Sequence, residues 1–131
     1  MIKLPKLDEQ SMYDYETYFH LTMNEERLGK FLVHYESMKI AQNIPGEIVE
    51  CGVFKGTSFM RFALLRNLMG GERSSRLLAF DTFSNNYPNS KYKEDKVQRK
   101  HWIKTAGAAS IGKNQLDNPL KKKKNFKFFR N

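Results

Sequence analysis

Apolar residues recur at helical spacing in the stretch TMNEERLGKFLVHYESMKIAQN, residues 22–43. The residues that share one face of this helix are Leu28, Phe31, Leu32, Tyr35 and Met38. This pattern predicts an amphipathic helix, with Thr22 or Asn24 as the residue that caps its first turn. Residues 1–21 mix charges and aromatic residues without a clean period, so they predict an arm or a short helix.

A strand, a helix and a second strand are predicted next. Pro45-Gly46 ends the helical pattern, and residues 47–51 form a short β-branched run that is typical of a buried strand. Residues 57–69 are apolar almost all round, as in a helix that covers a sheet, and residues 76–80 form a second apolar run. This order predicts a βαβ unit with parallel strands and a right-handed crossover.

The remainder of the chain extends this α/β pattern. Residues 84–110 are polar and predict a long excursion with some helix in it. Residues 111–124 predict a second crossover helix despite Pro119, and residues 125–129 predict a third strand. We therefore expect an incomplete Rossmann-like α/β fold of about three parallel strands with crossover helices. Its expected parts are an N-terminal helical segment, residues 1–44, and a cofactor-binding region, residues 45–131.

The net charge of +9 favours a nucleic-acid partner only if the basic residues lie along one face. Residues 113–131 hold seven Lys or Arg residues against one acid, Asp117, so they supply +6 of the charge. The lysines at 121–124 are contiguous, which is more typical of a solvated helix end than of a binding face. A basic nucleic-acid-binding module remains the alternative hypothesis, and we expect no such partner.

The single cysteine, Cys51, excludes an internal disulfide and any multi-cysteine metal site. We interpret it as a small buried hydrophobe within the first strand. No window approaches the roughly 20 apolar residues of a membrane span. Together these features predict a cytoplasmic protein without a membrane partner.

The stretch IVECGVFKGTSFMRF, residues 48–62, carries the candidate chemistry. Glu50 and Asp81 lie at the carboxyl ends of the two predicted strands, which is the ligand side of an open α/β sheet. A P-loop is excluded because Gly52 and Gly56 are one residue too close and Thr57 stands where the lysine belongs. The dinucleotide pattern G-x-G-x-x-G also fails, because bulky residues separate the two glycines, so NAD stays an open alternative with little support from the pattern.

A ligand with a ribose and an amino acid but no phosphate fits these residues better. Asp81 can accept hydrogen bonds from ribose hydroxyls, and Glu50 can meet a cationic amino group. Gly52 and Gly56 let backbone N–H groups approach a carboxylate. The ligand with these groups is S-adenosylmethionine.

The segments TMNEERLGKFL, IPGEIVECGVFKGTSF and RLLAFDTF, between Thr22 and Phe83, resemble the macrocin O-methyltransferase family of class I S-adenosylmethionine-dependent enzymes. The resemblance implies O-methylation of a hydroxyl on a small-molecule sugar or sugar nucleotide. It also implies a set of cofactor contacts. These are Glu50, Gly52, Gly56, Ser58 and Asp81, with Thr22 and Met23 closing over the cofactor.

The resemblance also implies a second half that this chain does not hold, with acidic residues that bind Mg²⁺. We therefore expect a truncated N-terminal half without metal ligands, in which catalysis by the chain alone is in doubt. His101, beside Trp102 in the long excursion, is the one catalytic candidate. A non-catalytic methyltransferase remnant is a further alternative. The exposed edge of the strand expected at 126–129 would favour homo-oligomers.

Overall fold

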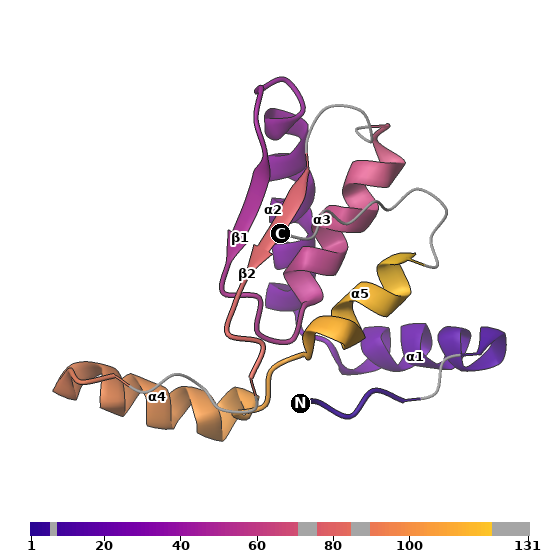
Figure 1. Cartoon of the computed structure of the whole chain (residues 1–131). Helices are drawn as coiled ribbons and strands as arrows, with labels where there is room; N and C mark the ends of the chain where they lie inside the picture. The colour runs from indigo at the N-terminus through magenta and orange to yellow at the C-terminus, as the bar shows by residue number, and fades with distance from the viewer. Residues whose placement is uncertain (6–7, 71–75, 85–89, 122–131) are drawn as a thin grey trace.

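The structure is a computed structural model that describes residues 1–5, 8–70, 76–84 and 90–121 (Figure 1). The elements are α1 (Glu9–Thr22), α2 (Glu25–Ala41), β1 (Ile48–Cys51), α3 (Thr57–Leu68), β2 (Leu77–Phe80), α4 (Lys93–Ala106) and α5 (Lys113–Lys121). They confirm the predicted helices and the first two strands, whereas the third strand, predicted at 125–129, lies outside the described residues. No described helix is long and apolar enough to cross a membrane.

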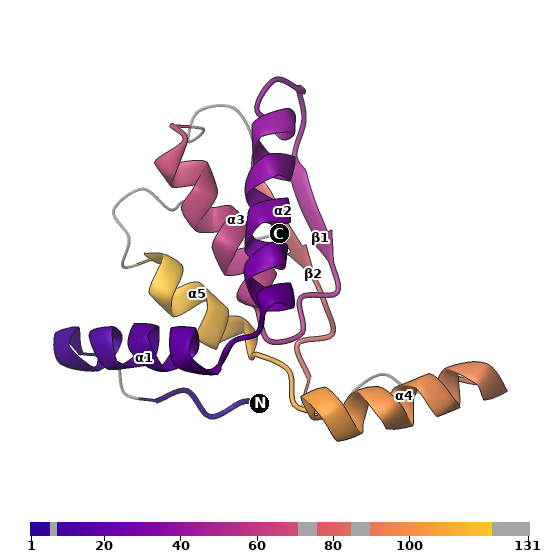
Figure 2. The same ribbon diagram turned by 180° about the vertical axis from the view of Figure 1, so that it is seen from behind.

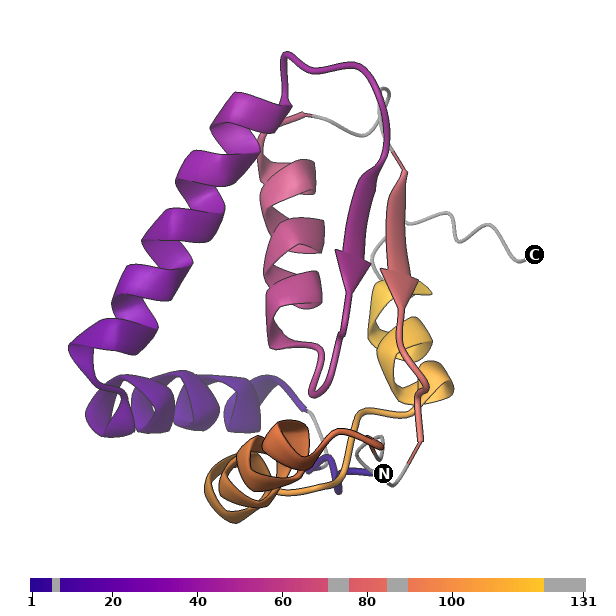
Figure 3. The ribbon, with the colours of Figure 1, turned by 90° about the vertical axis from the view of Figure 1, so that its left-hand side faces the viewer.

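β1 and β2 form a parallel two-stranded sheet in which Ile48 lies opposite Leu77 and Cys51 opposite Phe80. α3 makes the crossover between them, as the βαβ prediction requires. Both carboxyl ends point toward the end of the molecule where α1, α4 and the N-terminus lie (Figure 3). The described chain is thus a partial α/β fold, and its extension to a Rossmann-like sheet stays a prediction.

Side-chain caps explain where the two N-terminal helices begin. The Asp8 carboxylate accepts a hydrogen bond from the Ser11 backbone N–H at 2.8 Å and starts α1. The Asn24 side chain accepts one from the Arg27 N–H at 3.2 Å and starts α2, so Asn24 and not Thr22 is its cap. Of the five apolar residues predicted to share a face of α2, only Met38 is buried. The other four are exposed, and among the described elements α2 packs mainly against α3.

The hydrophobic core lies between α3, α5 and the turn after β1. Its buried residues are Val53, Phe59, Ala63, Ile111, Leu116 and Leu120, with Leu77 and Ala79 of β2 packed against them. Figures 1 and 2 place α3 and α5 on the same side of the strands. α5 continues past Pro119 because Leu116 and Leu120, exposed by 3% and 0%, pack into this core.

The opposite face of the sheet is exposed in the described part of the chain. Val49 and Phe80 are 52% and 59% exposed, and Cys51 is exposed as well. Side chains alternate between the two faces of a sheet, and the described helices pack on one face only. The prediction of fully buried strands and of a buried Cys51 is therefore wrong for the described residues.

Candidate functional site

The turn between β1 and α3, residues 52–56, is called the corner below. Its backbone takes positive φ at Gly52 (89°), Phe54 (50°) and Gly56 (81°). A side chain at Gly56 would also crowd the core, because its Cβ would lie 3.1 Å from Leu116 Cδ1 and 3.3 Å from Ile111 Cδ1, so both side chains would have to shift slightly. Glycine at 56 is thus needed both for the backbone conformation and for the close packing of α5.

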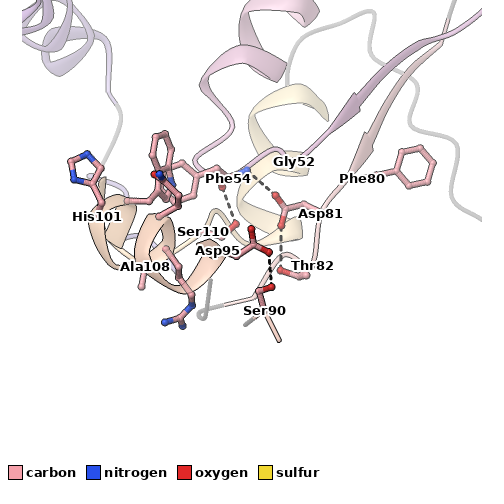
Figure 4. Close-up of a pocket in the computed structure, with 13 residues that line it drawn as sticks. Gly52, Phe54, Phe80, Asp81, Thr82, Ser90, Asp95, His101, Ala108 and Ser110 are labelled. Carbon is pink, nitrogen blue, oxygen red and sulfur yellow. Dashed lines mark hydrogen bonds between the residues drawn. The ribbon is translucent and has the colours of Figure 1, made fainter. Parts of the chain in front are cut away.

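Asp81, the first residue after β2, ties the ends of the two strands together. Its Oδ2 accepts hydrogen bonds from the backbone N–H groups of Val53 at 2.7 Å and Phe54 at 2.8 Å, and Figure 4 shows the bond from Phe54. Its Oδ1 accepts longer bonds, 3.2 Å each, from the Phe83 N–H and the Thr82 hydroxyl. The carboxylate therefore holds the corner with one oxygen and its own loop with the other.

These hydrogen bonds stabilise the charged form of Asp81. Burial alone raises the pKa of its carboxyl group. The N–H bonds from Phe54, Phe83 and Val53, with the Thr82 hydroxyl, outweigh burial and hold the pKa below its usual value. Asp81 is consequently a stable carboxylate at neutral pH.

The Phe54 carbonyl fixes the corner from the opposite side. It accepts hydrogen bonds from the Ile111 N–H at 2.7 Å and the Ser110 hydroxyl at 2.8 Å. The Ser110 carbonyl in turn accepts one from the Ile2 N–H at 3.1 Å. Sequence reasoning missed Ser110, because no local pattern signals a contact between residues 56 positions apart.

Glu50 lies near the end of β1, and one of its two carboxylate oxygens has no hydrogen-bond partner among the described residues. The Ser58 hydroxyl donates a hydrogen bond to Oε1. Oε2 is buried and has no hydrogen-bond partner among the described residues. Burial raises the pKa of Glu50, the Ser58 bond opposes this, and the nearby Asp81 charge adds to the rise. Oε2 of the half-buried Glu50 is thus a buried acceptor that a cationic group would satisfy.

A cavity of about 670 Å³ opens beside the corner. The sheet end supplies Gly52, Phe54, Phe80, Asp81 and Thr82, and the other lining residues are Ser90, Asp95, Gln98, Arg99, His101, Trp102, Ala108 and Ser110. The rings of Phe54 and Trp102 contact each other, with centroids 5.9 Å apart. α4 therefore forms a wall of the cavity opposite the strand ends (Figure 4).

Three of the predicted site residues, Gly52, Asp81 and His101, line this cavity. Figure 4 shows His101 at the end away from Asp81. Of the others, Gly56 belongs to the corner and Ser58 hydrogen-bonds Glu50 nearby. The cofactor contacts predicted for all of them stay predictions.

Thr22 and Met23 lie at the junction of α1 and α2 and are not among the cavity-lining residues. The Thr22 hydroxyl donates to the Tyr18 carbonyl at 2.7 Å, and the Met23 N–H donates to the Phe19 carbonyl at 2.8 Å. Both groups thus complete the end of α1. The cofactor contact predicted for Thr22 and Met23 stays a prediction.

Apart from His101, the lining residues of α4 were not named as site residues. Asp95, Arg99 and Trp102 are spaced by four and three positions, so they share one face of a helix. A helix was expected in residues 84–110, and this spacing around Trp102 was the signal that could have identified the face toward the cavity.

A metal site is not evident in the part of the chain that the structure describes. Within it, no three His, Cys, Asp or Glu residues gather in a way that could hold a metal ion. The described residues thus offer no ligand cluster for the Mg²⁺ that the resemblance implies. Residues 122–131, which the nucleic-acid alternative needs, lie outside the described residues, so no observation favours that alternative.

Comparison with known proteins gives one family. The model of the family described as macrocin-O-methyltransferase (TylF) matches residues 8–124, which is most of the chain. No curated protein and no solved structure matches the chain. The matched range holds every helix and strand of the described residues and both acids, Glu50 and Asp81.

Proposed function

The chain belongs to the macrocin O-methyltransferase family, and from this premise we propose that it binds S-adenosylmethionine at the corner for methyl transfer to a hydroxyl. Membership implies an O-methyltransferase. The observation that carries the proposal is the pair of carboxylates, Glu50 and Asp81, near the adjacent carboxyl ends of two parallel strands. In open α/β sheets this edge is where ligands bind.

The charge around Glu50 supports a cationic ligand. Its Oε2 is buried without a partner among the described residues, and the charge of Asp81 raises its pKa further. An ammonium group placed there would form a charge-assisted hydrogen bond and relieve the repulsion between the two acids. The cavity volume of about 670 Å³ is within the range of small-molecule sites.

Asp81 can meet a ribose without releasing the corner. Its Oδ2 is occupied by two short N–H bonds, whereas Oδ1 holds two bonds of 3.2 Å. One of these comes from the exposed Thr82 hydroxyl, which can rotate away and leave Oδ1 to a ribose hydroxyl. When bound, the cofactor supplies a methyl group on a sulfonium. The chain's own contribution is then to hold the donor in place.

The acceptor that we propose is a hydroxyl of a sugar or sugar nucleotide, which rests on the resemblance. α4 forms the wall of the cavity, so a substrate would lie between α4 and the corner. His101 is the candidate to take the hydroxyl proton because its side chain belongs to that wall. Mg²⁺, if used, would need ligands from outside the described residues.

Calorimetric titration with S-adenosylmethionine tests the cofactor site. We expect the wild-type chain to bind, and Glu50→Gln to bind about tenfold or more weakly, because one charge-assisted bond is lost. Glu47→Gln is the matched control: Glu47 precedes β1 and pairs with Arg76 at 2.8 Å, and its loss should leave binding unchanged. Wild-type-like binding by Glu50→Gln would remove Glu50 from the site, and no binding by the wild type would refute the proposal.

A further inference from the structure

The corner already contains an anion of its own. In dinucleotide-binding proteins the equivalent turn directs backbone N–H groups at a pyrophosphate. Here the two such groups, of Val53 and Phe54, donate to Asp81 Oδ2 at 2.7 and 2.8 Å. A carboxylate of the protein thus occupies the donors that a phosphate would use.

Phe54 adds a steric obstacle at the same place. Counting from Gly52, it stands where the pattern G-x-G-x-x-G has its second glycine, and its φ of 50° is one that glycine adopts readily. That second glycine serves to let a pyrophosphate approach the backbone. Here a benzyl side chain contacts Trp102 across the cavity, with 5.9 Å between the centroids.

The charge of the residues that line the cavity also disfavours binding of a phosphate. Among the described residues that line it, two are carboxylates, Asp81 and Asp95, and one is a guanidinium, Arg99. These three groups together carry one net negative charge, although the whole chain carries +9. A phosphate monoester would enter a site whose local charge opposes it.

We propose that Asp81 and Phe54 make this cavity selective against phosphorylated nucleotides, so that it accepts an adenosyl ligand and rejects the same ligand with a 5′-phosphate. Asp81 saturates and shields the corner N–H groups, and Phe54 blocks the close approach that a phosphate needs. This inference rests on the proposed function, which places an adenosyl group in the cavity. It assigns the choice between ligand classes to two residues.

Calorimetric titration with adenosine and with adenosine 5′-monophosphate tests the proposal. We expect the wild-type chain to bind the monophosphate at least about tenfold more weakly than adenosine. Asp81→Asn should weaken adenosine binding, because it loses the charge and keeps one acceptor. It should also reduce the ratio of the monophosphate Kd to the adenosine Kd about tenfold, because the charge that opposes the phosphate is removed. Asp95→Asn makes the same charge change in the same cavity without touching the corner, and should change the ratio less than about threefold.

The outcomes separate this inference from the cofactor proposal. Equal wild-type affinity for the two ligands would overturn the selectivity and leave the adenosyl site intact, whereas binding of neither would overturn the adenosyl site itself. Equal effects of Asp81→Asn and Asp95→Asn would overturn the role given to Asp81. Phe54→Gly is the second test variant if Asp81→Asn does not fold, because glycine adopts the positive φ at this position readily. It should also reduce the ratio, and an unchanged ratio would remove Phe54 from the proposal.

Discussion

At the scale of single residues, two carboxylates at one edge of the sheet are held in opposite electrostatic conditions. Asp81 receives three backbone N–H bonds and one hydroxyl bond, and its pKa is lowered. Glu50 receives one hydroxyl bond, is half-buried, and its pKa is raised. Burial prevails at Glu50, which is the more deeply buried and has a single donor, whereas four donors outweigh burial at Asp81. Asp81 is suited to hold the corner, and Glu50 to receive a cation.

We expect Glu50→Gln to raise the melting temperature of the ligand-free chain at neutral pH. Because the pKa of Glu50 is higher in the folded chain, its contribution to stability is full below the unfolded pKa and is lost as pH rises through the folded pKa. The substituted amide keeps an acceptor for Ser58 without the buried charge. Thermal melts at neutral pH and at about pH 4 should show the difference at neutral pH and its decrease in acid. A lower melting temperature for the variant at neutral pH would contradict this account.

Cys51 gives a second prediction at this scale. Its side chain is exposed on the uncovered sheet face, so we expect Ellman's reagent to label it stoichiometrically in native buffer. Cys51→Ser is the control and should show no labelling. Labelling that needs a denaturant would mean that this face is covered in solution.

At the scale of elements, the βαβ unit was predictable because each part has a local signal. The β-branched run at 48–51 indicates β1, and the apolar stretch at 57–68 indicates α3. The glycines at 52 and 56 indicate the turn between them, and the order of the elements implies the crossover. The exposure of β1 was not predictable in this way. The period of a sequence shows which residues share a face, and packing partners decide whether that face is covered.

The corner itself was predicted only in part. Its position, its glycines and Asp81 followed from the sequence. The bonds that fix it, from Asp81 Oδ2 to the corner N–H groups and from Ser110 to the Phe54 carbonyl, join residues 27 to 56 positions apart. Long-range contacts of this kind depend on the folded arrangement, so no local sequence pattern indicates them.

The start of α3 provides a test of this element. We expect Gly56→Ala to destabilise the chain by about 1–3 kcal/mol, because its φ of 81° is strained for alanine and its Cβ would press on Leu116 and Ile111. Gly29→Ala is the control: Gly29 lies within α2 with no atom within 4 Å of the added Cβ, and the change should stabilise by about 0.5–1 kcal/mol. Denaturant unfolding measures both, and equal effects would contradict the role of Gly56.

At the scale of the whole molecule, segments from distant parts of the chain meet at the carboxyl end of the sheet. The Ile2 N–H bonds the Ser110 carbonyl, and the Gln115 side chain bonds the Ile2 carbonyl at 2.8 Å. Ser110 bonds the corner in turn. The N-terminal residues therefore support the corner through the segment that leads into α5.

Substitutions at two apolar residues of the N-terminal segment, Ile2 and Leu4, test whether this segment is anchored. Ile2 packs against the core, so we expect Ile2→Ala to lower the free energy of unfolding by about 1–2 kcal/mol. Leu4, in the same segment, is 46% exposed, and Leu4→Ala should stay within about 0.5 kcal/mol of the wild type. Equal effects of the two substitutions in denaturant unfolding would show that Ile2 is not an anchor.

The central claim is that this chain holds an S-adenosylmethionine site at the corner, and one thermal melt tests it most directly. Circular dichroism would follow unfolding with and without saturating S-adenosylhomocysteine. The account predicts one cooperative transition that moves to higher temperature with the ligand. At a ligand concentration a hundred times Kd, the free energy of unfolding should rise by about 2.7 kcal/mol. A transition at the same temperature in both samples would contradict the claim.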